Sequence, residues 1–443
     1  MKIRLSDHFS YRRLMRFVLP SVIMMIVTSV YSIVDGFFVS NFVGKSAFAA
    51  VNLIMPFLMA LGAFGFMIGT GGSALVAKTM GEGEAEKANR YFSMLTYVLI
   101  VIGVALSAAG FIFIRPIAGL LGASGGVLED CIVYGRILLV ANAAFMLQNA
   151  FQSFLVVAEK PKFGLAISII AGLMNVALDF LLVYVFPLGL AGAAIATAAS
   201  QLAGAAVPLL YFLLCKDSAL RLTRAKFDAG ALLRSCINGS SEMLTNLSAS
   251  FVSMLYNFQL MRIAGENGVA AYGVIMYVNF IFMAFYFGFS IGSSPVFSYH
   301  YGAENHGELK GLFRKSLVII AIAAFTMTAL AELLASPLSR LFVGYDAELL
   351  AMTRTAFKLY SLSFLAAGFN IFGSAFFTAL NNGLLSAVIS FLRTLVFQVA
   401  AILILPALLG INGIWIALVA AEGVTLLVTF PLLAAKRRQY HYA

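Results

Sequence analysis

The chain has 443 residues, of which 62% are hydrophobic and 11% are charged, with a mean hydropathy of +0.97. Soluble domains carry roughly 25% charged residues, so this composition excludes an ordinary soluble protein and indicates a chain embedded in lipid. The net charge of +10 alone would suit a nucleic-acid partner, but the basic residues follow a membrane topology instead, and we expect no nucleic-acid binding.

Apolar segments long enough to cross a bilayer, about 20 residues each, follow one another along the whole chain. Six crossings in each half would give both halves the same orientation. This predicts an all-α membrane protein of twelve transmembrane helices, in two six-helix bundles related by a pseudo-twofold axis along the membrane normal. The predicted helices span 14–40, 47–73, 93–115, 132–157, 163–186, 191–215, 236–260, 268–292, 315–337, 350–378, 384–406 and 412–434.

The two halves repeat each other at a constant offset of 221 residues, which supports this plan. Many of the matches are Gly or Pro, which set backbone geometry and close packing rather than apolar character alone. A duplicated membrane bundle is typical of transporters, with a substrate path between the halves. Gly44, Gly71, Gly81, Pro116 and Gly192 recur as Gly265, Gly292, Gly302, Pro337 and Gly413.

Most of the 29 Lys and Arg residues lie in segments that this topology puts on one side of the membrane. The excess predicts cytoplasmic termini, with an uncleaved first helix after the charged segment 1–17. The polar link 216–234 then separates an N-lobe, 1–215, from a C-lobe, 235–443. The basic residues are Lys2, Arg4, Arg12, Arg13, Arg16, Lys78, Lys87, Arg90, Lys160, Lys162, Lys216, Arg221, Arg224, Lys226, Arg234, Lys310, Arg314, Lys315, Lys436, Arg437 and Arg438.

Two aspartates lie inside predicted helices of the first half, where a carboxylate costs at least about 2.5–3.5 kcal/mol. Asp35 lies in the first helix, 15 residues after Pro20, which we expect to bend that helix. Asp179 lies in the fifth helix, four residues after Asn175 and therefore on the same face, and the sixth helix supplies Thr197. These oxygens suit Na⁺, whereas two carboxylates in a dry pocket would hold a proton. The alternative is a polar network that only joins three helices.

The second half lacks this set of residues. At the offset of 221, Asp35 corresponds to Tyr256 and Asp179 to Ala400. If the aspartates only held helices together, both halves should keep them. The comparison therefore assigns the ion site to the first half.

Other polar residues within the apolar helices are candidates for the substrate cavity or for helix packing. Glu242 either faces a central cavity and attracts cations or pairs internally, and Arg393 and Glu422 are candidates for a buried ion pair. The four histidines fall outside the predicted helices, which argues against a buried histidine relay. The polar cavity candidates besides Glu242 are Gln148, Asn149, Asn279 and Tyr286.

The chain resembles the multidrug and toxic compound extrusion (MATE) transporters, and in general character the bacterial branch with the staphylococcal-type exporters. The resemblance rests on the 6+6 plan, the Pro20 to Asp35 spacing, the stretch 81–88 (GEGEAEKA), and Asn175, Asp179 and Thr197. It implies that these oxygen-bearing residues form an N-lobe cation site and that Pro20 marks a bend. Another branch uses a helix-ten aspartate in the C-lobe, where this chain has Asn370 and no carboxylate.

The resemblance implies secondary active export of cationic amphiphilic compounds in exchange for Na⁺ or H⁺, by alternating access. The protein would act as a multi-pass monomer in the bacterial inner membrane and need no cofactor. A lipid-linked oligosaccharide flippase of related architecture is the alternative, but it should carry a basic cavity for pyrophosphate. An intramembrane enzyme would need a His pair or a Ser/Lys dyad within the helices, so we expect no enzyme.

Overall fold

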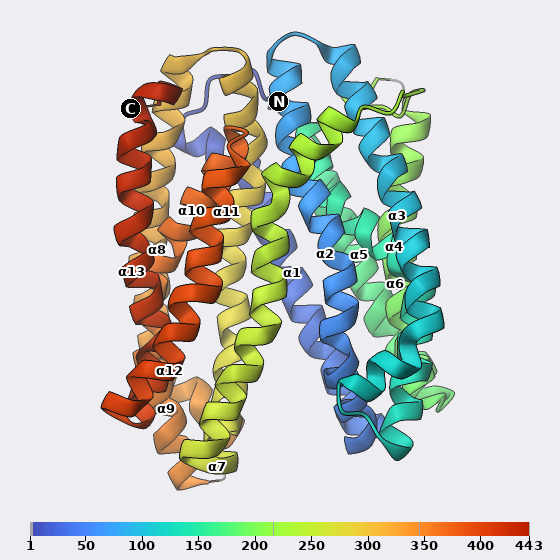
Figure 1. The fold of residues 1–443 in the computed structure, drawn as a ribbon, viewed down its shortest axis with the longest axis vertical. Helices are drawn as coiled ribbons and strands as arrows, with labels where there is room; N and C mark the ends of the chain where they lie inside the picture. The colour runs from blue at the N-terminus through green and yellow to red at the C-terminus, as the bar shows by residue number, and fades with distance from the viewer. Residues whose placement is uncertain (1–2, 216, 345, 443) are drawn as a thin grey trace.

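The computed structural model describes residues 3–215, 217–344 and 346–442, which are helical almost throughout and form two bundles side by side (Figure 1). Two of the basic residues used to predict the topology, Lys2 and Lys216, lie outside the described residues. The first bundle contains α1 (Tyr11–Phe38), η1 (Val39–Val43), α2 (Lys45–Gly81), α3 (Ala85–Leu120), α4 (Gly125–Val157), α5 (Pro161–Asp179), η2 (Phe180–Val185) and α6 (Gly189–Leu214).

The second bundle follows an extended link that ends at Asp228, whose side chain caps the next helix by accepting the Ala231 N–H. Its elements are α7 (Ala229–Gly302), α8 (His306–Val343), α9 (Ala347–Ser361), α10 (Phe364–Ala379), α11 (Gly383–Phe391), η3 (Leu392–Phe397), α12 (Gln398–Leu409) and α13 (Ile411–Tyr440).

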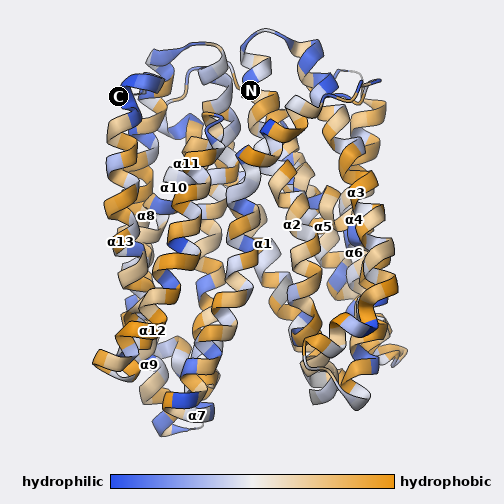
Figure 2. Ribbon diagram, viewed as in Figure 1, coloured by the Kyte–Doolittle hydropathy of each residue, from blue (hydrophilic) through white to orange (hydrophobic). Residues whose placement is uncertain are grey.

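The chain crosses the membrane twelve times, as the sequence predicts. Ten helices among the described residues are long and apolar enough to cross, and α9 and α10 pass the same test together despite a 45° bend. The 74-residue α7 is two crossings, because Gly265 breaks it with φ 61° and ψ −151°. That backbone conformation is open to glycine and costly for other residues. Hydrophobic residues predominate along most of the length of both bundles, and hydrophilic residues gather at the loops (Figure 2).

Several helices extend beyond their apolar segments at the end of the molecule where both termini lie, the terminal end (Figure 1). The second crossing of α7 continues to Gly302, ten residues past the predicted limit. The prediction that all histidines lie outside helices is therefore wrong for His300, which is buried near the end of α7, and for His306, which begins α8. The His300 ring packs edge-on against Phe9, with ring centroids 6.4 Å apart.

The N-terminal arm before α1 crosses the terminal end and bonds to both bundles. The backbone N–H of Leu5 donates to Glu159 of the first bundle at 2.9 Å. Glu308 of the second bundle accepts the Phe9 N–H at 2.8 Å and contacts His8 Nδ1 at 2.5 Å. Lys315 donates to the Phe9 carbonyl at 2.5 Å. The arm thus ties the bundles together at the end where they converge.

Glycines let the two bundles approach each other closely at the terminal end. A Cβ on Gly81 would overlap the carbonyl oxygen of Tyr299, and one on Gly302 would overlap that of Lys78. Gly81 and Gly302 are repeat mates, so each half offers the same backbone surface to the other. Towards the opposite end the bundles diverge (Figure 1). The repeated glycines therefore close one end of the interface between the bundles.

We expect Gly81→Ala and Gly302→Ala each to lower the melting temperature of the purified protein, because overpacking costs about 1–3 kcal/mol. Gly423→Ala is the matched control, since no heavy atom lies within 4 Å of its Cβ position. The usual gain of about 1 kcal/mol for Gly→Ala within a helix should appear there. Equal melting temperatures for all three variants would contradict the close approach.

Candidate ion and substrate sites

The structure brings the oxygen-bearing residues of the first bundle together between α1, α5 and α6. Thr197 on α6 donates its hydroxyl to Asp35 Oδ1 on α1 at 3.3 Å. The Asn175 amide nitrogen on α5 reaches the same Thr197 hydroxyl at 3.5 Å. Asp179 follows Asn175 by one helical turn and interacts electrostatically with Asp35. The Thr197 hydroxyl on α6 thus contacts both α1 and α5, and the site contains two carboxylates.

Several oxygens of this cluster are buried without a hydrogen-bond partner. Asp179 is 0% exposed, and neither of its carboxylate oxygens has a partner among the described residues. The same holds for Oδ1 of Asn175. Buried polar groups are normally hydrogen-bonded, so each exception needs an explanation. A cation shared between the carboxylates would satisfy these oxygens and relieve the repulsion between the two aspartates.

The chemistry of these oxygens fits a hard, singly charged cation or a proton. Two carboxylates, an amide and a hydroxyl are all oxygen donors, the type that hard cations prefer. Among the described residues, no group of three or more His, Cys, Asp and Glu could hold a transition metal. The donor set of this site therefore suits a hard cation or a proton.

Tyr134 on α4 is a fifth member that sequence reasoning missed. Its hydroxyl is buried without a hydrogen-bond partner in the described chain, and it interacts electrostatically with both Asp35 and Asp179. Tyr134 is one of 17 tyrosines, and nothing local in the sequence distinguishes it. Only the packing of α4 against the site reveals it.

Both acid-bearing helices change geometry soon after the acid. η2 begins at Phe180, directly after Asp179, and η1 begins four residues after Asp35. These are π-helical turns, which hold an extra residue per turn and are frequent at functional sites. α1 itself continues through Pro20 as one helix.

A cavity of about 250 Å³ lies between the bundles and has mostly apolar walls. Glu242 is the charged residue of its described lining, and Asn149 also reaches it, so two of the predicted cavity residues lie here. α1 contributes Met25 and Ser29. The described lining is completed by Phe66, Thr70, Ser73, Gln152, Ser153, Thr245, Asn246, Phe280, Met283, Ala284, Phe287, Ser290, Ile291, Ser294, Ala375 and Thr378.

The other three predicted cavity residues lie elsewhere in this conformation. Gln148 packs against Gly204 of α6, within the first bundle. Tyr286 donates its hydroxyl to the Phe364 carbonyl at 3.0 Å, inside the second bundle. Asn279 lines a separate small pocket with Tyr360. A polar residue within an apolar helix thus marks a helix contact as readily as a cavity wall.

α1 connects the ion cluster, the cavity and the interface between the bundles. Near its start, Val18 and Val22 pack closely against Gly292 and Gly288 of the second bundle. Its middle forms part of the cavity wall, and its last turns carry Asp35. A displacement of α1 at one of these places therefore reaches the other two.

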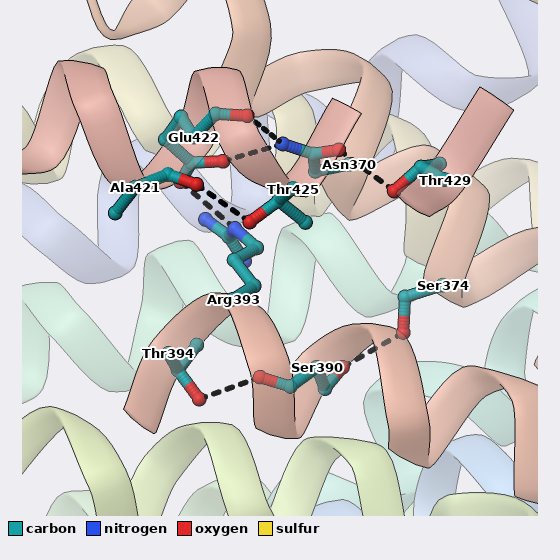
Figure 3. Close-up of polar contacts among 9 residues, drawn as sticks. All are labelled: Asn370, Ser374, Ser390, Arg393, Thr394, Ala421, Glu422, Thr425 and Thr429. Atoms are coloured by element: carbon teal, nitrogen blue, oxygen red, sulfur yellow. Dashed lines mark hydrogen bonds and ion pairs between the residues drawn. The ribbon is translucent and has the colours of Figure 1, made fainter. Parts of the chain in front are cut away.

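Arg393 and Glu422 neutralise each other inside the second bundle (Figure 3). Arg393 Nε on η3 donates to Glu422 Oε1 on α13 at 2.8 Å, so the expected pair forms. Asn370 on α10 donates to Glu422 Oε2 at 2.8 Å and accepts from the Thr429 hydroxyl at 2.8 Å. Asn370 is thus an amide bonded to a buried ion pair.

The comparisons with known proteins agree with the architecture and the repeat. The model of the MatE family matches the chain twice, over residues 20–181 and 243–404. The chain belongs to the MatE family. The match covers most of the chain and confirms the resemblance that the sequence analysis draws.

Similar proteins and structures lie at low sequence identity. The multidrug export protein MepA of Staphylococcus aureus is 22% identical over 417 residues, 93% of this chain and 91% of that protein. MepA of Staphylococcus haemolyticus is 22% identical over 97% of this chain and 94% of its own length. An outward-facing multidrug resistance MATE transporter superposes with a TM-score of 0.93 at 23% identity, covering 99% and 98% of the two chains. At this identity the superposition shows the fold.

We expect Asn370→Leu to destabilise the protein by about 1–3 kcal/mol for each polar group left unsatisfied, namely Glu422 Oε2 and the Thr429 hydroxyl. Thermal unfolding of the purified protein measures this. The matched control is Asn149→Leu at the repeat-mate position, because the Asn149 amide nitrogen has no partner among the described residues. A loss at Asn149 as large as at Asn370 would contradict the network.

Proposed function

We propose that the protein is a secondary active antiporter that exports cationic amphiphilic compounds in exchange for Na⁺ or H⁺. The observation that carries the proposal is the buried cluster of Asp35 on α1 and Asp179 on α5. The two carboxylate oxygens of Asp179 have no hydrogen-bond partner among the described residues. Multidrug export by the MepA relatives supports the substrate class. The protein is thus a transporter rather than an enzyme, and the exchanged ion is its cargo rather than a cofactor.

The proposed cycle couples the ion cluster to the cavity through α1. Na⁺ or H⁺ enters at Asp35, Asn175, Asp179 and Thr197, and the Tyr134 hydroxyl lies beside them. The positive charge removes the repulsion between the aspartates and lets α1 draw closer to α5 and α6. We propose that α1 then bends at Pro20, which changes the cavity wall at Met25 and Ser29 and weakens drug binding. Coupling of this kind is reciprocal, so bound drug weakens ion binding by the same factor.

The cavity suits a cation with an apolar body. Glu242 supplies the negative charge, and Phe66, Phe280 and Met283 supply apolar and aromatic surface. Aromatic faces attract cations as well as apolar groups. A flippase for a pyrophosphate-linked lipid would need basic residues at this place. The acidic wall therefore favours export of cations over the flippase alternative.

The orientation in the membrane is part of the proposal. The basic residues at the terminal end support cytoplasmic termini in a bacterial cell. With that orientation the two bundles converge on the cytoplasmic side and diverge on the outer side, which is an outward-facing arrangement. The ion cluster and the cavity lie within one chain, which supports a monomer as the transporting unit.

We expect Asp35→Asn and Asp179→Asn to abolish ion-driven export without unfolding the protein, because a neutral amide cannot balance a bound cation. Proteoliposomes loaded with ethidium measure this under an imposed Na⁺ gradient and, separately, under an imposed pH gradient. The gradient that drives wild-type export identifies the ion.

Asp217→Asn is the matched control, since Asp217 is an exposed aspartate between α6 and α7. It should export at the wild-type rate. Wild-type rates in both cluster variants would overturn the ion site, and a wild-type protein that neither gradient drives would overturn antiport itself.

A further inference from the structure

The second bundle holds three charged side chains near the membrane interior, two acids and one base. Arg393 and Glu422 form an ion pair in which their side chains are 12% and 1% exposed. Glu242 on α7 faces the cavity and makes no ion pair among the described residues. One negative charge is therefore left without a fixed counter-ion, and it is the one at the cavity wall.

The buried pair and the cavity wall are joined by one helix, α10. Asn370 in its middle bonds to Glu422, while Thr378 near its end lines the cavity. The Thr378 hydroxyl lies 3.5 Å from that of Ser241, the residue before Glu242. Between them, Ser374 on α10 bonds to the hydroxyl of Ser390, three residues before Arg393, at 2.8 Å. The three charged residues thus belong to one packed polar region.

Two carboxylates, those of Glu422 and Glu242, attract Arg393. It interacts electrostatically with Glu242 as well as with Glu422. In the structure its side chain extends towards Glu422, where Asn370 holds the second carboxylate oxygen in place (Figure 3). A guanidinium and a carboxylate in a low-dielectric interior attract strongly, so removal of the Glu422 charge leaves Glu242 as the acid that attracts Arg393.

We propose that Glu422 is a positioning residue that sets the charge of the central cavity: by holding Arg393 in a buried pair, it leaves Glu242 free to receive one positive charge from the substrate. The inference rests on the proposed export of cations and names the determinant of that selectivity. It assigns Arg393 a role as a retained counter-ion rather than a substrate contact. The cavity is then matched to a monocation.

Glu422→Gln tests the proposal directly, because it removes the charge that retains Arg393 and keeps the size of the side chain. Arg393 should then pair with Glu242, and the Kd of the monocation ethidium should rise about tenfold or more. The Kd of the neutral dye Nile red should change less than about twofold. Equilibrium fluorescence binding to the purified, monodisperse protein measures both.

Arg393→Gln should shift selectivity in the opposite direction. It leaves two uncompensated acids, so the ratio of propidium to ethidium affinity should rise about tenfold, since propidium is the dicationic analogue of ethidium. The double variant Arg393→Gln/Glu422→Gln removes the pair and keeps Glu242 free. Its Kd for ethidium should return to within about threefold of wild type.

Failure of the proposed function and failure of the role given to Glu422 would produce different binding results. Failure of wild-type protein to bind ethidium would overturn the proposed function. If wild type binds ethidium but the double variant binds it as weakly as Glu422→Gln does, the pair is only structural and the inference falls. If Glu422→Gln does not fold, Arg393→Gln decides alone, because an unchanged propidium-to-ethidium ratio overturns the inference and a raised one supports it.

Discussion

The cost of a charge without a counter-charge inside the bilayer organises this protein. The second half supplies its own cation, since Arg393 neutralises Glu422 and Asn370 completes the bonding. The first half does not, and Asp179 stays buried with partnerless oxygens beside Asp35. The repeated backbone thus holds a neutralised buried acid in one half and, in the other, buried carboxylates without a counter-charge, where we propose that an ion is exchanged.

The repeat is preserved where backbones meet rather than where charges lie. Gly81 and Gly302 each pack against a carbonyl of the other bundle, because any side chain there would overlap it. Conserving these contacts in both halves gives the bundles a shared, closely fitting surface at the terminal end. The charged positions lie away from this surface and have been free to differ.

In the mechanism we propose, α1 is the route by which an ion in one bundle affects the cavity between the two. It packs on second-bundle glycines through Val18 and Val22, passes the cavity at Met25 and Ser29, and carries Asp35. An element that touches all three places can transmit a small displacement without any contact between ion and drug. The proposed bending point, Pro20, lies between Val18 and Val22.

The sequence by itself determined the class of fold and identified the acids of the proposed ion site. Its apolar segments and the offset of 221 residues predicted twelve crossings, because lipid forces every crossing to satisfy its own backbone. Its rare intramembrane acids were identified at once, because charge there is costly enough to stand out. The placement of Asn175 and Asp179 on one face followed from helical spacing alone.

Only the tertiary structure decided which neutral polar residues share a site. Asn149 reaches the cavity, whereas Gln148, next to it in sequence, packs into α6, since adjacent residues on a helix face different neighbours. Tyr134 joins the aspartates, and His300 is buried under Phe9, through contacts between distant segments. A neutral polar side chain costs little in either place, so its position depends on helix packing that no local pattern encodes.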